Sequence, residues 1–168
     1  MEKIGFFGGC FNPVTKAHVE LIREVIQKEN LDKVYFVPMG DFYEKQDLIS
    51  FKQRKAMLAL ALQNEDKMEI LEISNQKEKT YAIDTFQKID CQFPEVQRFF
   101  IMGTDNYEKM RTWKNQELLQ KYHYILLDRN KESMSSTMVR NKIKQGEDFV
   151  ELVPEAIVAY IKENNLYK

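Results

Sequence analysis

Two short strings of residues, near the two ends of the chain, carry side chains that can bind phosphate and assist its reactions. The first runs from Ile4 to His18, as a hydrophobic segment, a glycine-rich turn and a helix start. Gly8 and Gly9 allow a ligand close to the backbone, and the N–H groups and dipole of a helix start attract anions. Because Thr15 and His18 lie three residues apart, they share one helix face and can reach the same phosphate. The string predicts a nucleotide-binding site.

The second string, MSSTMVR, runs from Met134 to Arg140. Ser135, Ser136 or Thr137 can cap a helix whose first N–H groups bind an anion. Arg140 shares a helix face with Thr137, and its guanidinium can donate two parallel hydrogen bonds to a phosphate. Taken alone, each string also fits an ordinary role, as a tight turn with a half-buried histidine or as a capped helix with a solvated arginine. Their occurrence together favours a nucleotide site.

Composition and missing motifs exclude several classes of protein. The chain has neither a G-x-G-x-x-G dinucleotide fingerprint nor a G-x-x-x-x-G-K-[ST] phosphate loop. Its formal net charge of −1 argues against nucleic acid as a partner. Cys10 and Cys91 are too few for a disulfide framework, and no signal peptide, membrane-spanning run or lipidation motif is visible. We therefore expect one domain, residues 1–168, in the cytoplasm and without a membrane partner.

Short apolar runs alternate with helical patterns along the whole chain. Five runs predict strands covered on both faces: Lys3–Phe7, Lys33–Pro38, Met68–Ile73, Gln97–Met102 and Tyr122–Leu127. Four helical patterns lie between them, and two more helices follow Ser136 and Pro154: Thr15–Lys28, Phe51–Leu62, Tyr81–Ile89 and Trp113–Lys121. This alternation predicts an α/β fold with a parallel sheet and right-handed crossovers.

The phosphate-binding candidates follow the carboxyl ends of these predicted strands. Gly8–His18 follows the first strand, Met39–Lys45 the second, Gly103–Asn106 the fourth, and Arg129 the fifth. Ligands of open parallel sheets bind beyond the carboxyl ends of the strands, where the strand order reverses. We therefore expect these segments to converge on one rim of the sheet.

Both strings resemble motifs of a known superfamily. The first, GGCFNPVTKAH, resembles the T/H-x-G-H signature of nucleotidyltransferases, with Ala17 in place of the glycine. The second resembles the I-S-S-T-x-x-R motif of the same superfamily. Strings at 80–85, 103–106 and 149–167, together with Trp113, resemble nicotinate and nicotinamide mononucleotide adenylyltransferases. This resemblance spans nearly the whole chain and implies a Rossmann-like open sheet of order 3-2-1-4-5 with helices on both faces.

The resemblance also implies an activity: transfer of AMP from ATP to nicotinate or nicotinamide mononucleotide, with release of pyrophosphate, in NAD biosynthesis. The implied catalytic residues are His18, Thr15 and Arg140. The implied ATP-binding residues are Gly8, Gly9, Phe11, Gly103, Asp105, Ser135, Ser136 and Thr137. The implied mononucleotide-binding residues are Lys45, Arg54, Tyr81, Thr85 and Trp113. Mg²⁺ is expected to bind through the ATP phosphates, without a dedicated set of protein ligands.

Several alternatives remain open at this level. Trp113 could pack in the core, Lys45 and Arg54 could be solvated charges, and Asp105 could cap a helix. The chain could serve another phosphate acceptor, of the pantetheine-phosphate or cytidylyl type, or bind nucleotide without turnover. The string Thr80–Thr85 resembles bacterial enzymes that act on nicotinate mononucleotide, and this resemblance favours nicotinate, whose carboxylate would need backbone N–H groups around Tyr81 or Thr85. The oligomeric state stays open.

Overall fold

A five-stranded parallel sheet forms the centre of the protein. The computed structural model describes residues 1–42, 47–73, 80–128 and 135–168. The strands lie in the order β3-β2-β1-β4-β5, and every neighbouring pair is parallel. Their bounds are β1 Lys3–Gly9, β2 Lys33–Pro38, β3 Met68–Ile70, β4 Gln97–Gly103 and β5 Tyr124–Leu127. The predicted fold class and strand order are confirmed.

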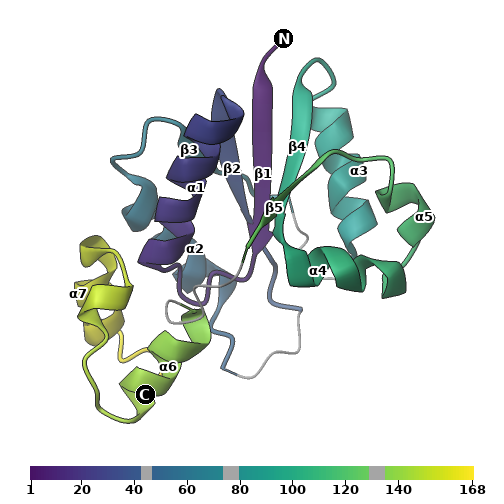
Figure 1. The fold of residues 1–168 in the computed structure, drawn as a ribbon. Coiled ribbons are helices and arrows are strands. Elements are labelled where there is room, and N and C mark those ends of the chain that lie inside the picture. The colour runs from purple at the N-terminus through teal and green to yellow at the C-terminus, as the bar shows by residue number, and fades with distance from the viewer. Residues whose placement is uncertain (43–46, 74–79, 129–134) are drawn as a thin grey trace.

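Helices cover both faces of the sheet (Figure 1). The α-helices of the described residues are α1 Lys16–Glu29, α2 Phe51–Leu62, α3 Ala82–Gln92, α4 Thr104–Lys109, α5 Gln116–Leu119, α6 Ser136–Lys144 and α7 Glu155–Glu163. Short 3-10 helices, η1 at Met110–Thr112 and η3 at Val150–Leu152, precede α5 and α7. In Figure 1, α1, α2 and α7 lie on one side of the sheet, and α3 and α5 lie on the other.

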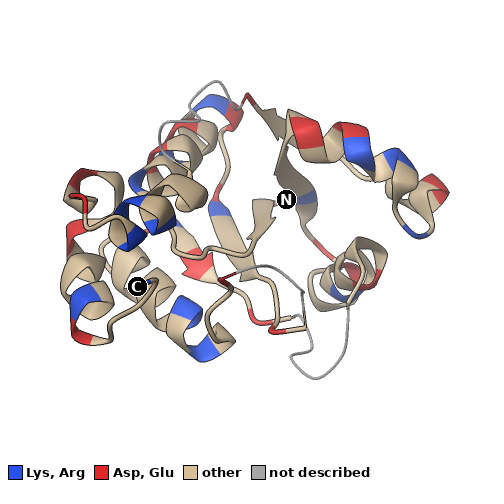
Figure 2. Cartoon of the chain, turned by 90° about the horizontal axis from the view of Figure 1, so that it is seen from below, with Lys and Arg blue, Asp and Glu red and all other residues tan. Residues whose placement is uncertain are grey.

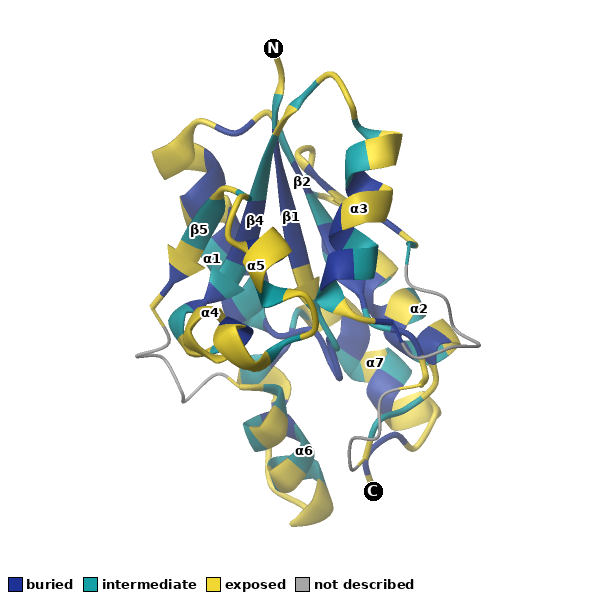
Figure 3. Ribbon diagram, turned by 90° about the vertical axis from the view of Figure 1, so that its right-hand side faces the viewer, coloured by how far each residue is buried: buried dark blue, intermediate teal, exposed yellow. Residues whose placement is uncertain are grey.

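The two faces of the sheet carry separate hydrophobic cores. Successive side chains of a strand point to opposite faces, so Phe6 joins one core and Phe7 the other. The Phe7 core is packed by α1, α2 and α7 through residues such as Ile22 and Ile157. The Phe6 core is packed by α3 and α5, with Ile83 among its residues. The inner strand β1 is accordingly buried through its middle (Figure 3), whereas the edge strands β3 and β5 carry exposed residues such as Glu69 and Leu126.

Two predicted elements differ clearly in their bounds, and the other predicted ranges agree with the structure to within about three residues at each end. The strand expected over Met68–Ile73 ends at Ile70, after three residues paired with β2. The helix expected over Trp113–Lys121 is confined to Gln116–Leu119. Asn115 adopts the left-handed conformation, with φ of 54°, which interrupts any helix starting at Trp113. The prediction for 113–121 is therefore wrong at its start, and Trp113 lies in the turn between η1 and α5.

The strand order reverses at β1. The chain passes from β1 to β2 on one side, and β4 pairs with β1 on the other. Gly8 and Gly9 end β1, and Gly103 ends β4, so their turns meet at the rim where ligands of such sheets bind. Viewed from this rim, basic and acidic residues are interspersed over the helices (Figure 2). No broad basic face is seen there among the described residues, so recognition of an anion at this rim must depend on single hydrogen-bond donors and cations at defined positions.

Candidate active site

Thr15 and His18 form a reciprocal cap at the start of α1. The Thr15 hydroxyl accepts the His18 backbone N–H at 3.3 Å, and the Thr15 N–H donates to His18 Nδ1 at 2.9 Å. Because Nδ1 acts as an acceptor, the neutral imidazole carries its proton on Nε2. His18 thus has the tautomer that can donate from Nε2 to a phosphate oxygen.

The predicted phosphate contact of Thr15 has no exposed atom to make it. Thr15 is fully buried, at 0% exposure, whereas His18 is half-buried. The His18 ring packs against the rings of Phe7 and Phe11, with centroids 6.0 and 5.4 Å away. Thr15 and Phe11 therefore hold the His18 ring in place, and His18 is the residue of these three that reaches the surface. The Ala17 side chain is 7% exposed and covers little of the surface around His18.

The second string docks directly on the first. Ser135 is the cap of α6, and its hydroxyl accepts the Met138 N–H at 3.1 Å. The Ser136 hydroxyl donates to the Pro13 carbonyl at 2.7 Å. The Arg140 guanidinium donates to the Asn12 carbonyl at 2.7 Å and to the Thr137 hydroxyl at 3.2 Å.

These contacts bring the two strings, which are more than a hundred residues apart in sequence, into one site as expected. The two Arg140 bonds use two of the five N–H groups that an arginine carries. Within the part of the chain that the structure describes, Arg140 makes only these two bonds, so donors remain for a phosphate.

Asn12 joins four segments of the chain around this turn. Its side-chain oxygen accepts from the Tyr167 hydroxyl at 2.7 Å and from the Ile49 N–H at 3.4 Å. Its amide donates to the Asp47 carbonyl at 3.0 Å, and its own carbonyl accepts from Arg140. Asn12 is 4% exposed, and a buried amide with its hydrogen bonds satisfied fixes a single geometry. Burial raises the pKa of the Tyr167 phenol far above its ordinary value, so Tyr167 stays a donor.

Arg54 does not lie where a mononucleotide phosphate could meet it. Its side chain is fully buried, and its guanidinium donates to the carbonyls of Ile49, Cys10 and Met39 at 2.9, 2.9 and 2.7 Å. A fourth bond reaches the Asp41 carboxylate at 3.1 Å. Arg54 therefore ties the turn after β1 to the loop after β2, and its predicted role as a surface ligand is not supported by its placement.

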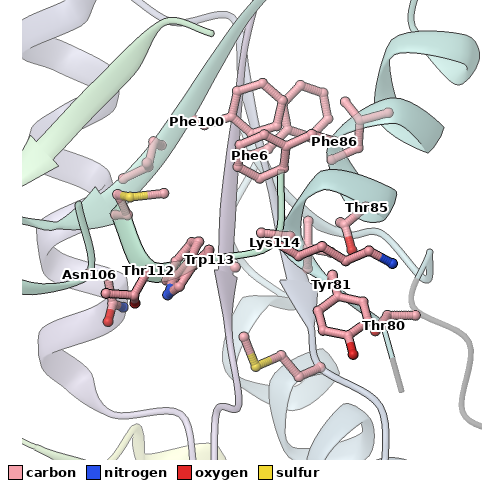
Figure 4. A pocket seen from close by; sticks show the side chains of 17 residues that line it. Phe6, Thr80, Tyr81, Thr85, Phe86, Phe100, Asn106, Thr112, Trp113 and Lys114 are labelled. Atoms are coloured by element: carbon pink, nitrogen blue, oxygen red, sulfur yellow. The ribbon is translucent and has the colours of Figure 1, made fainter. Parts of the chain in front are cut away.

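A cavity of about 420 Å³ opens beside the glycine turn (Figure 4). Its walls come from the ends of β1, β2 and β4, the start of α3, and the segment from α4 to Lys114. Phe6, Phe86 and Phe100 close its inner end. A concave apolar site of this size with a few polar groups suits a small flat ligand.

The cavity brings together three of the predicted mononucleotide-binding residues. Trp113 lies on one wall, and Tyr81 and Thr85 lie on the other (Figure 4). Lys114 also lines the cavity, with its ammonium 4.6 Å from the centroid of the Tyr81 ring. Trp113 is half-buried and borders the Phe6 core, so it both packs and presents an edge to the cavity.

The predicted ATP-binding residues gather at the same rim. Gly8 lines the cavity, and a Cβ built there would meet only the Val37 carbonyl, at 3.9 Å, so the space above Gly8 is open. Gly9 lies against the Phe11 ring, 3.2 Å from such a Cβ. Gly103 precedes α4, and Asp105 lies exposed in its first turn, not at the cap.

Two further expectations fall outside the described residues. Lys45 and Arg129 both belong to segments that the structure does not describe, so their proposed contacts stay predictions. Within the ranges it does describe, no three His, Cys, Asp or Glu side chains cluster as metal ligands would. Nor is any helix there long and apolar enough to cross a bilayer.

Sequence reasoning did not single out three residues that lie at the site. Asn12 and Tyr167 stood inside the strings that carried the resemblance, but nothing in their spacing showed that they meet. Lys114 falls within the helix predicted over Trp113–Lys121, whereas in the structure it lines the cavity. Its neighbour Trp113, which the sequence predicts to contact the pyridine ring, was the available signal, because the two residues are adjacent and line the same cavity.

Comparison with known proteins identifies relatives along the whole chain. A family model described as cytidylyltransferase-like matches residues 6–142. A probable nicotinate-nucleotide adenylyltransferase of Halalkalibacterium halodurans is 32% identical, covering 100% of this chain and 92% of the relative. The nicotinate-nucleotide adenylyltransferase of Bacillus subtilis is 30% identical, and 100% of each chain is covered.

Solved structures show the same fold. The nicotinic acid mononucleotide adenylyltransferase of Plasmodium falciparum, complexed with NaAD, superposes with a TM-score of 0.82 at 19% identity. The match covers 99% of this chain and 98% of that one. A putative nicotinate-nucleotide adenylyltransferase from Vibrio parahaemolyticus superposes with a TM-score of 0.80, also at 19% identity, over 99% and 96% of the two chains.

Proposed function

The chain belongs to the nicotinate-nucleotide adenylyltransferases of the cytidylyltransferase-like family, and we propose that it transfers AMP from ATP to nicotinate mononucleotide in NAD biosynthesis. The observation that carries this proposal is the neighbourhood of two half-sites. His18 and Arg140 lie at the glycine turn, and the cavity with Trp113 opens on the same turn at Gly8. A phosphate-binding half and a ring-binding half thus share one border.

The reaction needs positioning more than covalent help. A phosphate oxygen of the mononucleotide attacks the α-phosphorus of ATP, a new P–O bond forms, and the bond to the β-phosphate oxygen breaks. Pyrophosphate leaves with the electron pair of that bond. Such transfers are accelerated by in-line placement and by donors aimed at the developing negative charge.

We assign those donors to the two ends of the chain. His18 Nε2–H donates to an α-phosphate oxygen, because its Nδ1 is engaged by Thr15. Arg140 and the first N–H groups of α6 hold the departing pyrophosphate, whose charge suits a guanidinium and a helix start. Thr15 and Asn12 keep these groups in place.

Mg²⁺ enters this scheme as part of the substrate, bound to the ATP phosphates. The described residues offer no acidic cluster for it, and Mg²⁺ commonly keeps several waters while bridging phosphate oxygens. When bound, it neutralises phosphate charge. We place the reaction in the cytoplasm, in agreement with the two free thiols of Cys10 and Cys91.

The proposal is tested by incubating the protein with Mg²⁺, ATP and either pyridine mononucleotide, and measuring pyrophosphate and dinucleotide. Turnover with nicotinate mononucleotide is expected. Trp113→Ala should raise the KM for the mononucleotide about tenfold and leave the KM for ATP nearly unchanged, because stacking on an aromatic ring contributes about 1–3 kcal/mol. Trp113→Phe is the matched control and should keep most of the affinity. Absence of turnover with both mononucleotides overturns the proposal.

A further inference from the structure

Helix α6 is joined to the rest of the protein mainly by polar contacts. It projects beyond the end of the sheet at which β1 ends (Figure 3). Of its nine residues, all within the described chain, Val139 alone is buried. The Ser136 hydroxyl and the Arg140 guanidinium attach its first half to the glycine turn. In its last turn, Lys144 Nζ donates to the Asp47 carboxylate at 2.5 Å. With so little buried surface, α6 depends on these contacts for its orientation.

Lys144 completes a ring of hydrogen bonds that begins and ends at Asn12. The Asn12 carbonyl accepts from Arg140, and the Asn12 amide donates to the Asp47 carbonyl at 3.0 Å. The Asp47 carboxylate then accepts from Lys144. Because Arg140 and Lys144 are four residues apart, they lie on the same face of α6. This face is therefore attached at two points, to Asn12 in the first half of the helix and to Asp47 in its last turn.

Two attachment points fix the direction of a helix, whereas attachment at one end lets it tilt. Arg140 uses two of its N–H groups on Asn12 and Thr137, and the direction of the others follows the axis of α6. A displacement of about 1 Å in a group that contacts the reacting phosphates can cost about a hundredfold in rate. The Lys144 ammonium itself is paired with a carboxylate, so its contribution is to the geometry of its helix.

We infer that Lys144 is a positioning residue, whose ion pair with Asp47 orients α6 so that the remaining donors of Arg140 meet the departing pyrophosphate. The inference rests on the proposed function, because it concerns the pyrophosphate half of the same site. The Lys144 and Asp47 side chains are 38% and 33% exposed, and an ion pair of this kind contributes little to stability. Loss of the pair should therefore lower turnover in a protein that remains folded.

The test measures kcat and the KM for ATP in Lys144→Met, Asp47→Asn and the double variant. Lys144→Met should lower kcat about fivefold at low salt, the upper range for a partly exposed ion pair. Asp47→Asn should lower kcat about threefold, because a neutral amide accepts a weaker hydrogen bond than a carboxylate. Asparagine also tolerates the left-handed backbone at Asp47, where φ is 65°. The double variant should be no slower than Lys144→Met, because both changes break one pair.

Three controls separate this role from a general structural one. Lys142→Met should keep the parent kcat, because Lys142 lies on the same helix with a similar exposure of 34% but pairs with Glu147. Lys144→Arg keeps the charge and should restore most of the turnover. In an Arg140→Lys background, Lys144→Met should change kcat by less than about twofold, since the guanidinium to be oriented is absent. Added salt should narrow the gap between the parent and Lys144→Met, because it screens the pair.

Each outcome decides between the two proposals. Parent-like kinetics in Lys144→Met overturn the inference and leave the proposed function standing. A loss in Lys144→Met that is missing in Asp47→Asn, or that persists in full in the Arg140→Lys background, also overturns it, because Lys144 would then act without Asp47 or without Arg140. A parent that turns over neither mononucleotide overturns the proposed function and the inference with it. A loss shared by both single variants, not enlarged in the double variant and absent in the Arg140→Lys background, supports the inference.

Discussion

Removing the buried guanidinium of Arg54 should lower the free energy of unfolding and loosen the turn after β1. Its four hydrogen bonds run to three carbonyls and to Asp41, and the side chain is fully buried. Asp41 is 44% exposed and can be solvated, so the main loss from deleting Arg54 is at the three carbonyls, and each buried polar group left unsatisfied costs about 1–3 kcal/mol. Since whole domains are stable by about 5–15 kcal/mol, Arg54→Met should remove a large part of the free energy of unfolding.

Arg54→Lys separates the loss of geometry from the loss of charge. A lysine keeps the positive charge but has no planar fork to span Cys10, Met39 and Ile49. We expect it to cost about 2 kcal/mol, the size of one lost hydrogen bond to a charged group. Because the Cys10 carbonyl belongs to the glycine turn, kcat should fall in both variants.

Denaturant unfolding followed by circular dichroism, beside steady-state kinetics, checks these values. Arg23→Met is the matched control, because Arg23 pairs with Glu65 on the surface and its side chain is 55% exposed. Its loss should cost less than about 1 kcal/mol. The reasoning is refuted if the free energy of unfolding of Arg54→Met lies within about 1 kcal/mol of the parent value, which is the loss expected for a surface ion pair. A raised KM for the mononucleotide with unchanged stability would instead return Arg54 to the role of a phosphate ligand.

Three further outcomes follow from the site. His18→Ala should lower kcat about a hundredfold, the effect of losing one placed donor to the transition state, with a much smaller change in ATP binding; normal turnover would remove His18 from the mechanism. Arg140→Lys should lower kcat although it keeps the charge, because a lysine cannot replace the guanidinium that donates to both the Asn12 carbonyl and the Thr137 hydroxyl. Kinetics like the parent's would show that Arg140 is only a surface charge. Tyr167 should make stability depend on alkaline pH, because its ordinary pKa of 10.0 is raised on folding. Below that value both states are protonated; above it the unfolded state ionises first, so the free energy of unfolding falls by up to about 1.4 kcal/mol per pH unit for this group. Unfolding measured between about pH 9 and pH 11 should show a shallower decline in Tyr167→Phe, and equal slopes would contradict the buried hydroxyl.

The strands and long helices could be predicted because their residues carry a local pattern. The runs Lys33–Pro38 and Phe51–Leu62 coincide with β2 and α2, since burial on both faces gives continuous apolar stretches and the buried face of a helix places apolar residues such as Met57, Leu58 and Leu62 at helical spacing. The short helix α4 has no buried residue and hence no stripe to reveal it. Asn115, in the left-handed conformation, ended the helix predicted from Trp113.

Individual residues of the site could be predicted, but the hydrogen bonds that join them could not. The residue types and spacing predicted the glycine turn, His18 and Arg140 as site residues. The parallel topology of the sheet places them on one rim. The burial of Arg54 depends on three loops from different strands, which no local pattern encodes. The same holds for the contact of Lys114 with the Tyr81 ring across the cavity.

The hydrogen bond from Tyr167 to Asn12 joins residues 155 apart, and this separation has a consequence for how the protein is made. A chain emerging from the ribosome presents its glycine turn early, and helices such as α1 and α2 can form locally within it. The side chains that hold the turn, at Ser136, Arg140 and Tyr167, are synthesised far later. Contacts this distant in sequence form slowly, because the intervening chain must first be ordered. The nascent protein therefore passes through a stage in which its sheet is assembling while the glycine turn still lacks these contacts, and the turn is fully held only after Tyr167 has been synthesised and has docked.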